Sequence, residues 1–581
     1  MAGPAFTPAK SVLLAVQLAD KADIRCLRTL ISQNRKTLHT ELVLRILLSH
    51  LPESIDSSVY VLFLQDLDSA SIEEDPDHPV DSSELSYLDD AEAKKKVRKL
   101  NLLALRWADA PDDAPEDPLV LFLIHRSLRI DLNTGLITQL PALLSPFLHR
   151  SQYLRNWMVS SILPLLRFNY EYYPEYATTL SISQFEALDG RAGVNLLLSR
   201  TGKGGRTADI GRDLKGLVGP WMYGRNLPRR RKSRTNSVYD VPSLTLALDE
   251  APDYRYTAWE EVFTWLLSEA TNSWRTAVEA VEQWDGPGDI DLGTYADGTE
   301  WLEEDDQIHL ERRYARTILA TAYSITETSE EALNGVQRIL AKIITLLDKD
   351  RIPTLQAAAA ILTPVSGLEE MSVSDQTNKC LRNGLLDEEN TLTTPKADSI
   401  KLLHALLVSA YICGKLSFTM SIKSAGELFF LQNKEEQMNV YNSLMSQLAS
   451  GPKEDDRYWI KTRNQILWLQ NWGAEELAEE ATDVSSTQNG RGILGSLPKE
   501  VIEMGILKAL LTNTRTLTTT SKILPAPLIS TIRLRSRQIY IREVGKASWK
   551  RASRQNDRIS RHGSLRSGHQ PKQNQRWCQE S

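Results

Sequence analysis

The sequence predicts an all-α protein, folded as an elongated α-solenoid of stacked helix pairs. Apolar residues recur at helical spacing in runs of about 12–20 residues, and short polar breaks separate these runs. Alternating β-branched runs between Asn-Gly or Asp-Gly turns do not occur in series, which argues against a sheet. A chain of 581 residues also exceeds the usual size of one core. This favours a stack over the alternative, a compact helical bundle.

The N-terminal region supplies the first expected helices. Ser11–Ala19 is apolar but short and contains Gln17, so we expect an amphipathic helix, with a signal peptide as the alternative. Glu41–Leu51 has a polar residue at every fourth position, which predicts a helix that is covered on more than one side. Pro52 ends this helix, and Ser58–Leu67 predicts the next one.

Two helix starts carry the pattern of a capping box. Thr328 is followed three residues later by Glu331, and Ser183 by Glu186. Behind Thr328, an apolar stripe at helical spacing is expected to face the core; it comprises Leu333, Val336, Leu340, Ile343 and Leu347.

The C-terminal half continues the helical pattern. Pro395 is expected to begin a helix that reaches about Leu416, and Gly451-Pro452 to end one that began near Lys434. Within the first of these, Leu402–Cys413 is the best membrane candidate, but twelve residues are too few to span a bilayer. We therefore expect a soluble chain.

The polar breaks divide the chain into four predicted parts. Residues 1–223 and 252–528 form two solenoid segments, and the basic, polar residues 224–251 link them. Residues 285–306 read as an acidic surface loop with nine carboxylates and no Lys or Arg. Residues 529–581 form the last part, and the stretch from 546 to 576 within it contains nine Lys and Arg but one Asp. This tail is expected to be disordered, or to result from an incorrect gene structure.

Composition excludes several classes of protein. Lys and Arg number 68 and Asp and Glu 75, so the formal charge of -7 argues against a general nucleic-acid binder. The cysteines lie far apart without metal-ligand spacing, which indicates a reducing compartment and no disulfide framework. They are Cys26, Cys380, Cys413 and Cys578.

Two ligand-binding patterns are present only in part. Gly202-Lys203 suggests a phosphate-binding loop, but Leu197 stands where the upstream glycine belongs and Gly204 where the hydroxyl belongs. Asp289–Glu300 places carboxylates at several calcium-loop positions, but Thr294 replaces the turn glycine. A solvated acidic loop is the simpler interpretation of the second pattern.

The remaining chemical candidates favour the core. His404 lies in an apolar helix and is expected to be a satisfied core residue, with a ligand role as the alternative. Core packing is also expected for the tryptophans of two successive helices, with an exposed partner site as the alternative; they are Trp259, Trp265, Trp274 and Trp284. No HExxH, nucleophile elbow or catalytic carboxylate pair occurs. We therefore assign no catalytic, cofactor-binding or metal-binding residue and expect neither enzymatic activity nor a cofactor.

A basic cluster at Arg229–Arg234 follows a glycine-rich stretch that begins at Gly211. Such a cluster serves as a nuclear import signal, as a lipid or RNA patch, or as a solvated linker that no partner reads. These alternatives stay open at this point.

Five segments, in order, resemble the fungal Sec-thirty-nine family, which is related to the animal neuroblastoma-amplified-sequence protein. The segments are LHTELVLRILLSHLPESIDSSVY (38–60), DLKGLVGPWMYG (213–224), WRTAVEAVEQWDGPGDIDLGTY (274–295), ASGPKEDDRYWIKTRNQILWLQNWG (449–473) and EMGILKALLTNTR (503–515). The resemblance covers roughly residues 11–515, and no family-like helix pattern follows Leu528.

The resemblance implies a non-catalytic α-solenoid subunit of the Dsl tethering complex, peripheral on the cytoplasmic face of the endoplasmic reticulum. This complex captures COPI-coated vesicles that return from the Golgi and engages the SNAREs that fuse them. The implied partners are the Dsl subunit and SNARE N-terminal domains, with membrane contact through the SNAREs and without nucleic acid.

On this view Leu217–Tyr223, within the glycine-rich stretch that begins at Gly211, ends the first solenoid segment. Trp221 packs against that segment, and Gly216, Gly219 and Gly224 serve tight turns. A nuclear helical scaffold or nucleic-acid adaptor, favoured only by the basic linker and tail, is the alternative.

Overall fold

The computed structural model confirms the all-α solenoid fold. It describes residues 7–72, 80, 85, 87–107, 115–176, 180–203, 206–226, 257–297, 304–347, 352–365, 384–452, 455–473 and 491–514. Every regular element in these ranges is helical, and none of them contains a β-strand.

The chain divides into two compact units. The first unit comprises Met1–Ala358, Gly367–Gly414 and Thr419–Leu431. The second unit comprises Ala359–Ser366, Lys415–Phe418 and Gln432–Ser581. The chain passes between the two units several times, first within α18 (Leu355–Ile361).

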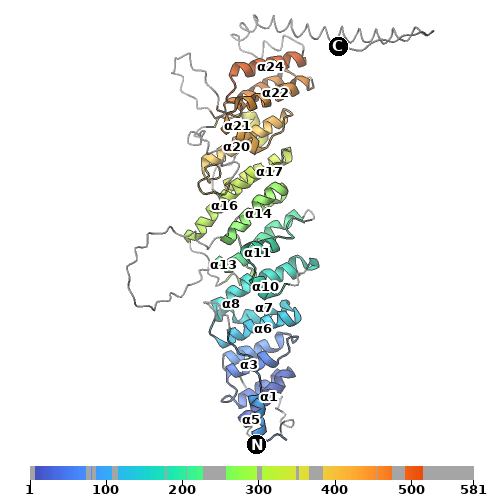
Figure 1. Cartoon of the computed structure of the whole chain (residues 1–581), viewed down its shortest axis with the longest axis vertical. Helices are drawn as coiled ribbons and strands as arrows, with labels where there is room; N and C mark the ends of the chain where they lie inside the picture. Colours follow the sequence, from blue (N-terminus) through green and yellow to red (C-terminus); the bar gives the residue numbers. More distant parts are fainter. Residues whose placement is uncertain are drawn as a thin grey trace, which may run out of the picture. The chain divides into compact units, whose positions relative to one another are not determined.

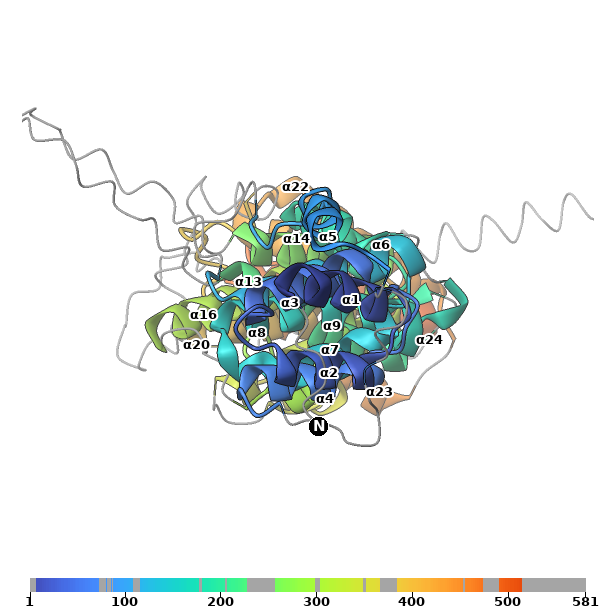
Figure 2. The ribbon, with the colours of Figure 1, turned by 90° about the horizontal axis from the view of Figure 1, so that it is seen from below.

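The first unit begins with two rows of helices that lie side by side. In one row α1 contacts α3, and α3 contacts α6; in the other α2 contacts α4, and α4 contacts α7. Figure 2 shows α1 and α3 on one side and α2 and α4 on the other. The helices are α1 (Pro8–Asp20), α2 (Ile24–Gln33), α3 (Thr40–His50), α4 (Ser58–Asp68), α5 (Asp90–Arg98), α6 (Pro118–Thr134) and α7 (Leu140–Leu144). Successive pairs therefore bury one another's apolar faces, as in a solenoid.

Local sequence explains the ends of these helices. Asp117 caps α6 by accepting a hydrogen bond from the backbone N–H of Leu119, and Pro118 occupies the first turn. Gly135 ends α6 in the left-handed region at a φ of 68°. Short 3₁₀ turns join several elements; they are η2 (Ile137–Gln139), η3 (Ser145–Arg150), η6 (Pro174–Tyr176), η8 (Thr207–Asp209) and η11 (Gly293–Tyr295).

A helical run from Gln152 to Tyr172 interrupts the regular pairs. It consists of α8 (Gln152–Trp157), the π-helical η4 (Met158–Ile162), α9 (Leu163–Leu166) and the π-helical η5 (Arg167–Tyr172). Pro164 lacks an N–H, and its ring crowds the carbonyl four residues earlier. A wider π turn directly before Pro164 accommodates that ring without ending the run.

The rest of the first unit repeats the two-row arrangement. Figure 1 shows α11 next to α14, and α14 next to α16. One row joins α11, α14, α16 and α21, and the other joins α12, α15 and α17. The elements are α10 (Ile182–Glu186), α11 (Gly190–Leu197), α12 (Ile210–Asp213), the π-helical η9 (Leu214–Val218), α13 (Gly219–Asn226), α14 (Thr257–Asn272), α15 (Trp274–Gln283), α16 (Glu304–Ser324), α17 (Glu330–Leu346), α20 (Ala397–Lys415) and α21 (Ile422–Leu431). The core lies between the two rows.

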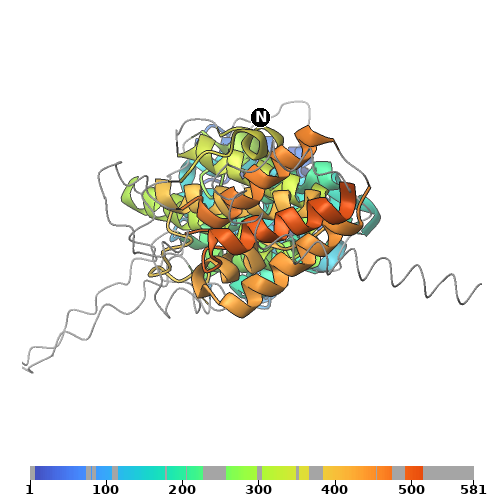
Figure 3. The ribbon, with the colours of Figure 1, turned by 90° about the horizontal axis from the view of Figure 1, so that it is seen from above.

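The second unit is a smaller helical group. It contains α22 (Lys434–Ser450), α23 (Asp456–Asn471) and α24 (Lys499–Thr514). Figure 3 shows α24, drawn in red, lying along the orange helices of this unit, and α24 contacts both α22 and α23.

Several predicted helices are confirmed, and two predicted caps are wrong. The helices expected after Pro52, Pro395 and Lys434 are α4, α20 and α22. The cap of α17 is Ser329 instead of Thr328, and the capping box of α10 pairs Ser181 with Gln184 instead of Ser183 with Glu186. In both places a neighbouring serine has the extended backbone that a cap requires.

The membrane candidate is longer than the sequence suggested. α20 has 19 residues and is long and apolar enough to cross a membrane by length and composition. Most of it is buried inside the first unit, with Leu402, Leu406 and Ile412 fully enclosed. Its burial, and not its length, favours a core helix.

The predicted division at a linker stays a prediction. Most of residues 224–251 and all of 529–581 lie outside the described residues. On either side of the linker, α11 and α13 both contact α14, so helices from both predicted segments belong to the first unit.

Candidate functional site

The glycine-rich stretch that starts at Gly211 is helical as far as it is described, to Asn226, and this part has no loop in which to hold a phosphate. It runs through α12, η9 and α13 without interruption. The prediction that Gly216, Gly219 and Gly224 make tight turns is therefore wrong. A Cβ at Gly216 would overlap the hydroxyl of Tyr172, and one at Gly219 would lie 3.0 Å from Cγ2 of Ile290. These two glycines allow neighbouring segments to approach the helix closely.

Trp221 packs in the core, as predicted. Its side chain is 2% exposed, and its ring lies 6.4 Å from that of Phe185 in α10. The indole also fills the space beside Gly193 in α11. The Pro-Trp-Met-Tyr part of the stretch is thus a packing element of the first unit.

The acidic loop after α15 is attached to this stretch. Asp289 forms an ion pair with Lys215 at 2.8 Å, and the N–H of Asp291 donates to the carbonyl of Lys215 at 3.0 Å. Arg167 is buried and donates to the carbonyl oxygens of Gly216, at 2.9 Å, and Asp291, at 2.6 Å. One guanidinium therefore joins the two segments.

The first half of the acidic loop differs from the predicted surface loop. Leu292 is 2% exposed and packs with Val159 and Tyr223, and Ile290 and Tyr295 border this cluster. Alternating acidic and apolar residues let the segment bury one side and pair the other with cations. Residues 298–303 of the predicted loop lie outside the described residues, and its last residues, Glu304–Asp306, form the first turn of α16.

The calcium-loop pattern does not assemble into a metal site in the described part of the chain. Asp289 pairs with Lys215, and Asp291 accepts a hydrogen bond from the N–H of Gly293 at 2.8 Å. No group of three potential metal ligands occurs among the described residues, which exclude Glu300. The described carboxylates serve the fold.

The other candidates occupy structural positions. Gly202 lies in a turn after α11, where its φ is +71°, and no strand precedes it. Trp259 and Trp284 are 1% exposed and stacked at 6.0 Å, whereas Trp265 and Trp274 are half-buried. Core packing is therefore confirmed for two of the four tryptophans.

His404 is half-buried within α20. Its Nε2 is buried and has no hydrogen-bond partner among the described residues. Burial lowers the pKa of the imidazole, which favours the neutral ring. The sequence predicted a satisfied core residue; the ring is half-buried, and its Nε2 is not satisfied by any described residue.

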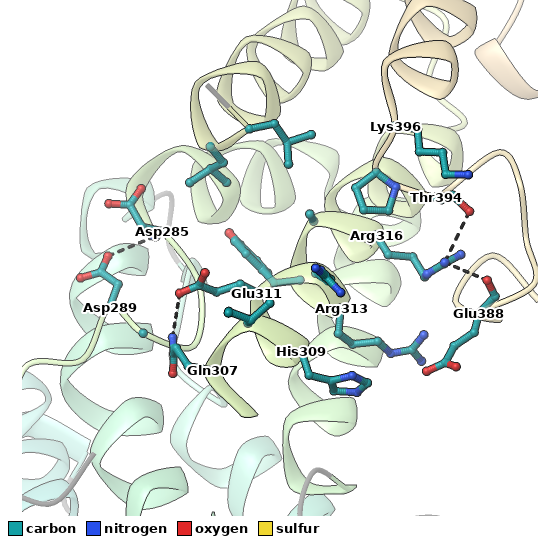
Figure 4. A pocket seen from close by; sticks show the side chains of 18 residues that line it. Asp285, Asp289, Gln307, His309, Glu311, Arg313, Arg316, Glu388, Thr394 and Lys396 are labelled. Carbon is teal, nitrogen blue, oxygen red and sulfur yellow. Dashed lines mark hydrogen bonds between the residues drawn. The ribbon is translucent and has the colours of Figure 1, made fainter. Parts of the chain in front are cut away.

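A cavity of about 1180 Å³ opens beside the first half of α16 (Figure 4). Arg313 forms a bidentate pair with Glu260, at 2.6 and 2.8 Å. Arg316 is buried and donates to the carbonyl oxygens of Asp387, Glu388 and Asn390. The pKa of Arg313 is raised mainly by Glu260, and burial lowers that of Arg316.

These arginines have a structural role in the cavity wall. The segment that leads into α20 is irregular, so its carbonyl oxygens lack helical hydrogen-bond donors. Arg316 donates to three of them. On the opposite side in Figure 4, Asp285 donates its backbone N–H to Asp289, and Gln307 donates to Glu311. The arrangement holds a loop in place and does not bring a nucleophile and a base together.

The second unit is held together by polar contacts between α22, α23 and α24. Asn513 of α24 donates to the carbonyl oxygens of Leu448, Gly451 and Pro452 at the end of α22. Arg463 of α23 and Glu503 of α24 form an ion pair at 2.7 Å. The last turn of α22 therefore finds its hydrogen-bond donor in a distant helix.

The family model of the secretory pathway protein Sec39 matches residues 12–536. The chain belongs to this family. No curated protein matches the sequence. The match extends past Leu528, beyond the point where the sequence pattern suggested that the resemblance ends.

Membership of the Sec-thirty-nine family places the chain in the secretory pathway. Two pairs of the segments that resemble the family meet in space. Residues 213–224 contact 274–295 in the first unit, and 449–473 contact 503–515 in the second. Spacing along the sequence gave no sign of these pairings. The basic cluster Arg229–Arg234 lies outside the described residues.

Proposed function

We propose that this chain is a non-catalytic scaffold subunit of the Dsl vesicle-tethering complex at the endoplasmic reticulum. There it supports the capture of COPI-coated vesicles that return from the Golgi, and the assembly of the SNAREs that fuse them. The observation that carries this proposal is the family match over residues 12–536. A secretory-pathway family is hard to reconcile with the nuclear alternative.

The proposed partners are the Dsl subunit and the N-terminal domains of reticulum SNAREs. The chain attaches to the cytoplasmic face of the membrane through these SNAREs. Paired rows of helices leave long outer faces for such partners. Exposed apolar side chains on these faces, such as Leu62 in α4 and Leu132 in α6, at 68% and 77% exposure, support protein docking.

Depletion of the chain in its native cells tests the proposal. A tagged resident protein of the reticulum that depends on retrieval should escape to the cell surface, and a fluorescent fusion of the chain should label the reticulum. A chain that accumulates in the nucleoplasm, with retrieval unaffected by its depletion, would contradict the proposal and favour the nuclear adaptor.

A further inference from the structure

A second cavity, of about 510 Å³, lies in the first unit among α11, α14 and α15. Its wall includes Ser199 and Lys203 from the end of α11 and the turn that follows it. Trp265, Ser268 and Glu269 of α14 also line it. Residues at these spacings share one face of a helix, so the indole, hydroxyl and carboxylate face the same space.

Glu269 is the unusual member of this wall. Its side chain is half-buried, yet it has no ion pair or side-chain hydrogen bond with any described residue. Two other half-buried carboxylates of this unit are paired: Glu260 with Arg313, and Glu279 with Arg338. Burial raises the pKa of Glu269 because no neighbouring cation offsets the loss of solvation.

Lys203 is the cation in the cavity wall, but it forms no ion pair with Glu269. It is exposed and forms no ion pair within the described part of the chain. A lone carboxylate is also a poor metal site, since calcium and magnesium need several oxygen ligands. A single cationic side chain with several hydrogen-bond donors would therefore suit the unpaired carboxylate and the hydroxyls of this cavity.

We propose that this cavity binds an arginine side chain of a protein partner, with Glu269 as its ion-pair partner and Trp265 as its stacking surface. A guanidinium presents donors in a fixed plane, so it pairs with a carboxylate while its face lies on an indole. Its remaining N–H groups reach hydroxyls such as those of Ser199 and Ser268. A lysine ammonium is a compact point charge without a flat face, so it pairs with the carboxylate but stacks less well on the indole.

The chain's own basic linker is the competing source of an arginine. It connects α13 to α14, and Arg229–Arg234 lies within it, outside the described residues. The inference rests on the proposed action through protein partners. A peptide assay nevertheless tests the cavity by itself, so its failure leaves the tethering proposal untouched.

The test is titration of the full chain with N-acetyl-Ala-Arg-Ala-amide, followed by saturation-transfer NMR. Matched peptides carry citrulline, which has the same shape without the charge, or lysine. The arginine peptide should bind, the lysine peptide more weakly, and the citrulline peptide at least tenfold more weakly. Glu269→Gln should weaken arginine binding about tenfold, or about 1.4 kcal/mol, and Trp265→Leu severalfold.

Glu261→Gln is the matched control, because it makes the same change on α14 outside the cavity wall. It should leave binding unchanged, and circular dichroism should show that each variant keeps its helices. Equal binding of the citrulline or lysine peptide, or undiminished binding by Glu269→Gln, would overturn the proposal. Binding that appears only after Arg229–Arg234 are changed to Ser would assign the cavity to the chain's own linker instead.

Discussion

The indole of Trp221 fills the space that a side chain on residue 193 would need, and Gly193 leaves that space open. This contact joins α13 to α11, and the aromatic ring is almost fully buried. Because a buried tryptophan has little freedom to move, the contact gives a direct test of the packing in the first unit.

Gly193→Ala should destabilise the first unit by about 1–3 kcal/mol. Alanine has the higher helix propensity, but here its Cβ overlaps the indole ring. Denaturant unfolding measures the change. Gly414→Ala is the control, because a Cβ there meets no atom within 4 Å. It should leave stability unchanged or raise it slightly; an equal loss in both variants would mean that Trp221 does not pack as described.

Glu503→Gln should loosen the second unit. Glu503 is 1% exposed and pairs with Arg463. Removing one partner leaves a poorly solvated charge, which costs about 3–5 kcal/mol when the pair is fully buried and less here, since Arg463 is 19% exposed. Hydrogen exchange of the α24 amides measures the loss.

Glu331→Gln makes the same chemical change in an exposed pair with Arg275. It should change the protection of α17 little, because exposed pairs contribute about 0–1 kcal/mol. Unchanged α24 protection in Glu503→Gln would show that the pair does not hold the second unit together.

The histidine in α20 predicts a pH dependence. Burial lowers the pKa of His404 in the folded chain below its usual 6.5. The unfolded chain therefore binds a proton that the folded chain does not, and stability falls as the pH drops below about 6.5. His404→Gln should reduce the loss of stability between about pH 7.5 and pH 5.5. An exposed-site control, His149→Gln, should show the full wild-type loss, and the same loss in His404→Gln would exclude this histidine as a cause.

Periodicity predicted the helices because each helix carries its own apolar pattern. Leu333 and Val336 face the core as their spacing requires. The N-caps of α17 and α10 lie one and two residues from the predicted positions, at Ser329 instead of Thr328 and at Ser181 instead of Ser183. In each place two nearby hydroxyl residues could serve as the cap. Local sequence does not state which of two neighbouring hydroxyls has the required backbone.

Contacts between segments that are distant in the chain could not be predicted from the sequence. The sequence suggested a turn at Gly219, but in the structure Ile290 packs against this glycine. It suggested a calcium ligand at Asp289, but this carboxylate pairs with Lys215. Glu269 carried no signal either, because its lack of a partner is visible only when its neighbours in space are known. Pairing in space decides these roles, and pairing depends on the whole fold.

The proposed function predicts different effects for two sets of substitutions. Changing Arg229–Arg234 to Ser should leave folding and SNARE co-precipitation near wild type, because this polar segment has no helical periodicity. Leu44→Asp should abolish binding of whichever partner contacts the N-terminal helices. Leu44 is fully buried in α3, and an unpaired buried charge costs several kcal/mol, of the order of 3–5. Loss of SNAREs from the linker variant, with retention by Leu44→Asp, would make the linker the binding site.

Affinity purification of the tagged chain from its native cells is the most direct test of the proposed tethering role. The Dsl subunit and SNAREs of the endoplasmic reticulum should be enriched with it, and Leu44→Asp should remove whichever of them binds the N-terminal helices. Co-purification of nuclear or nucleic-acid-binding proteins, without any reticulum SNARE or tethering subunit, would contradict it.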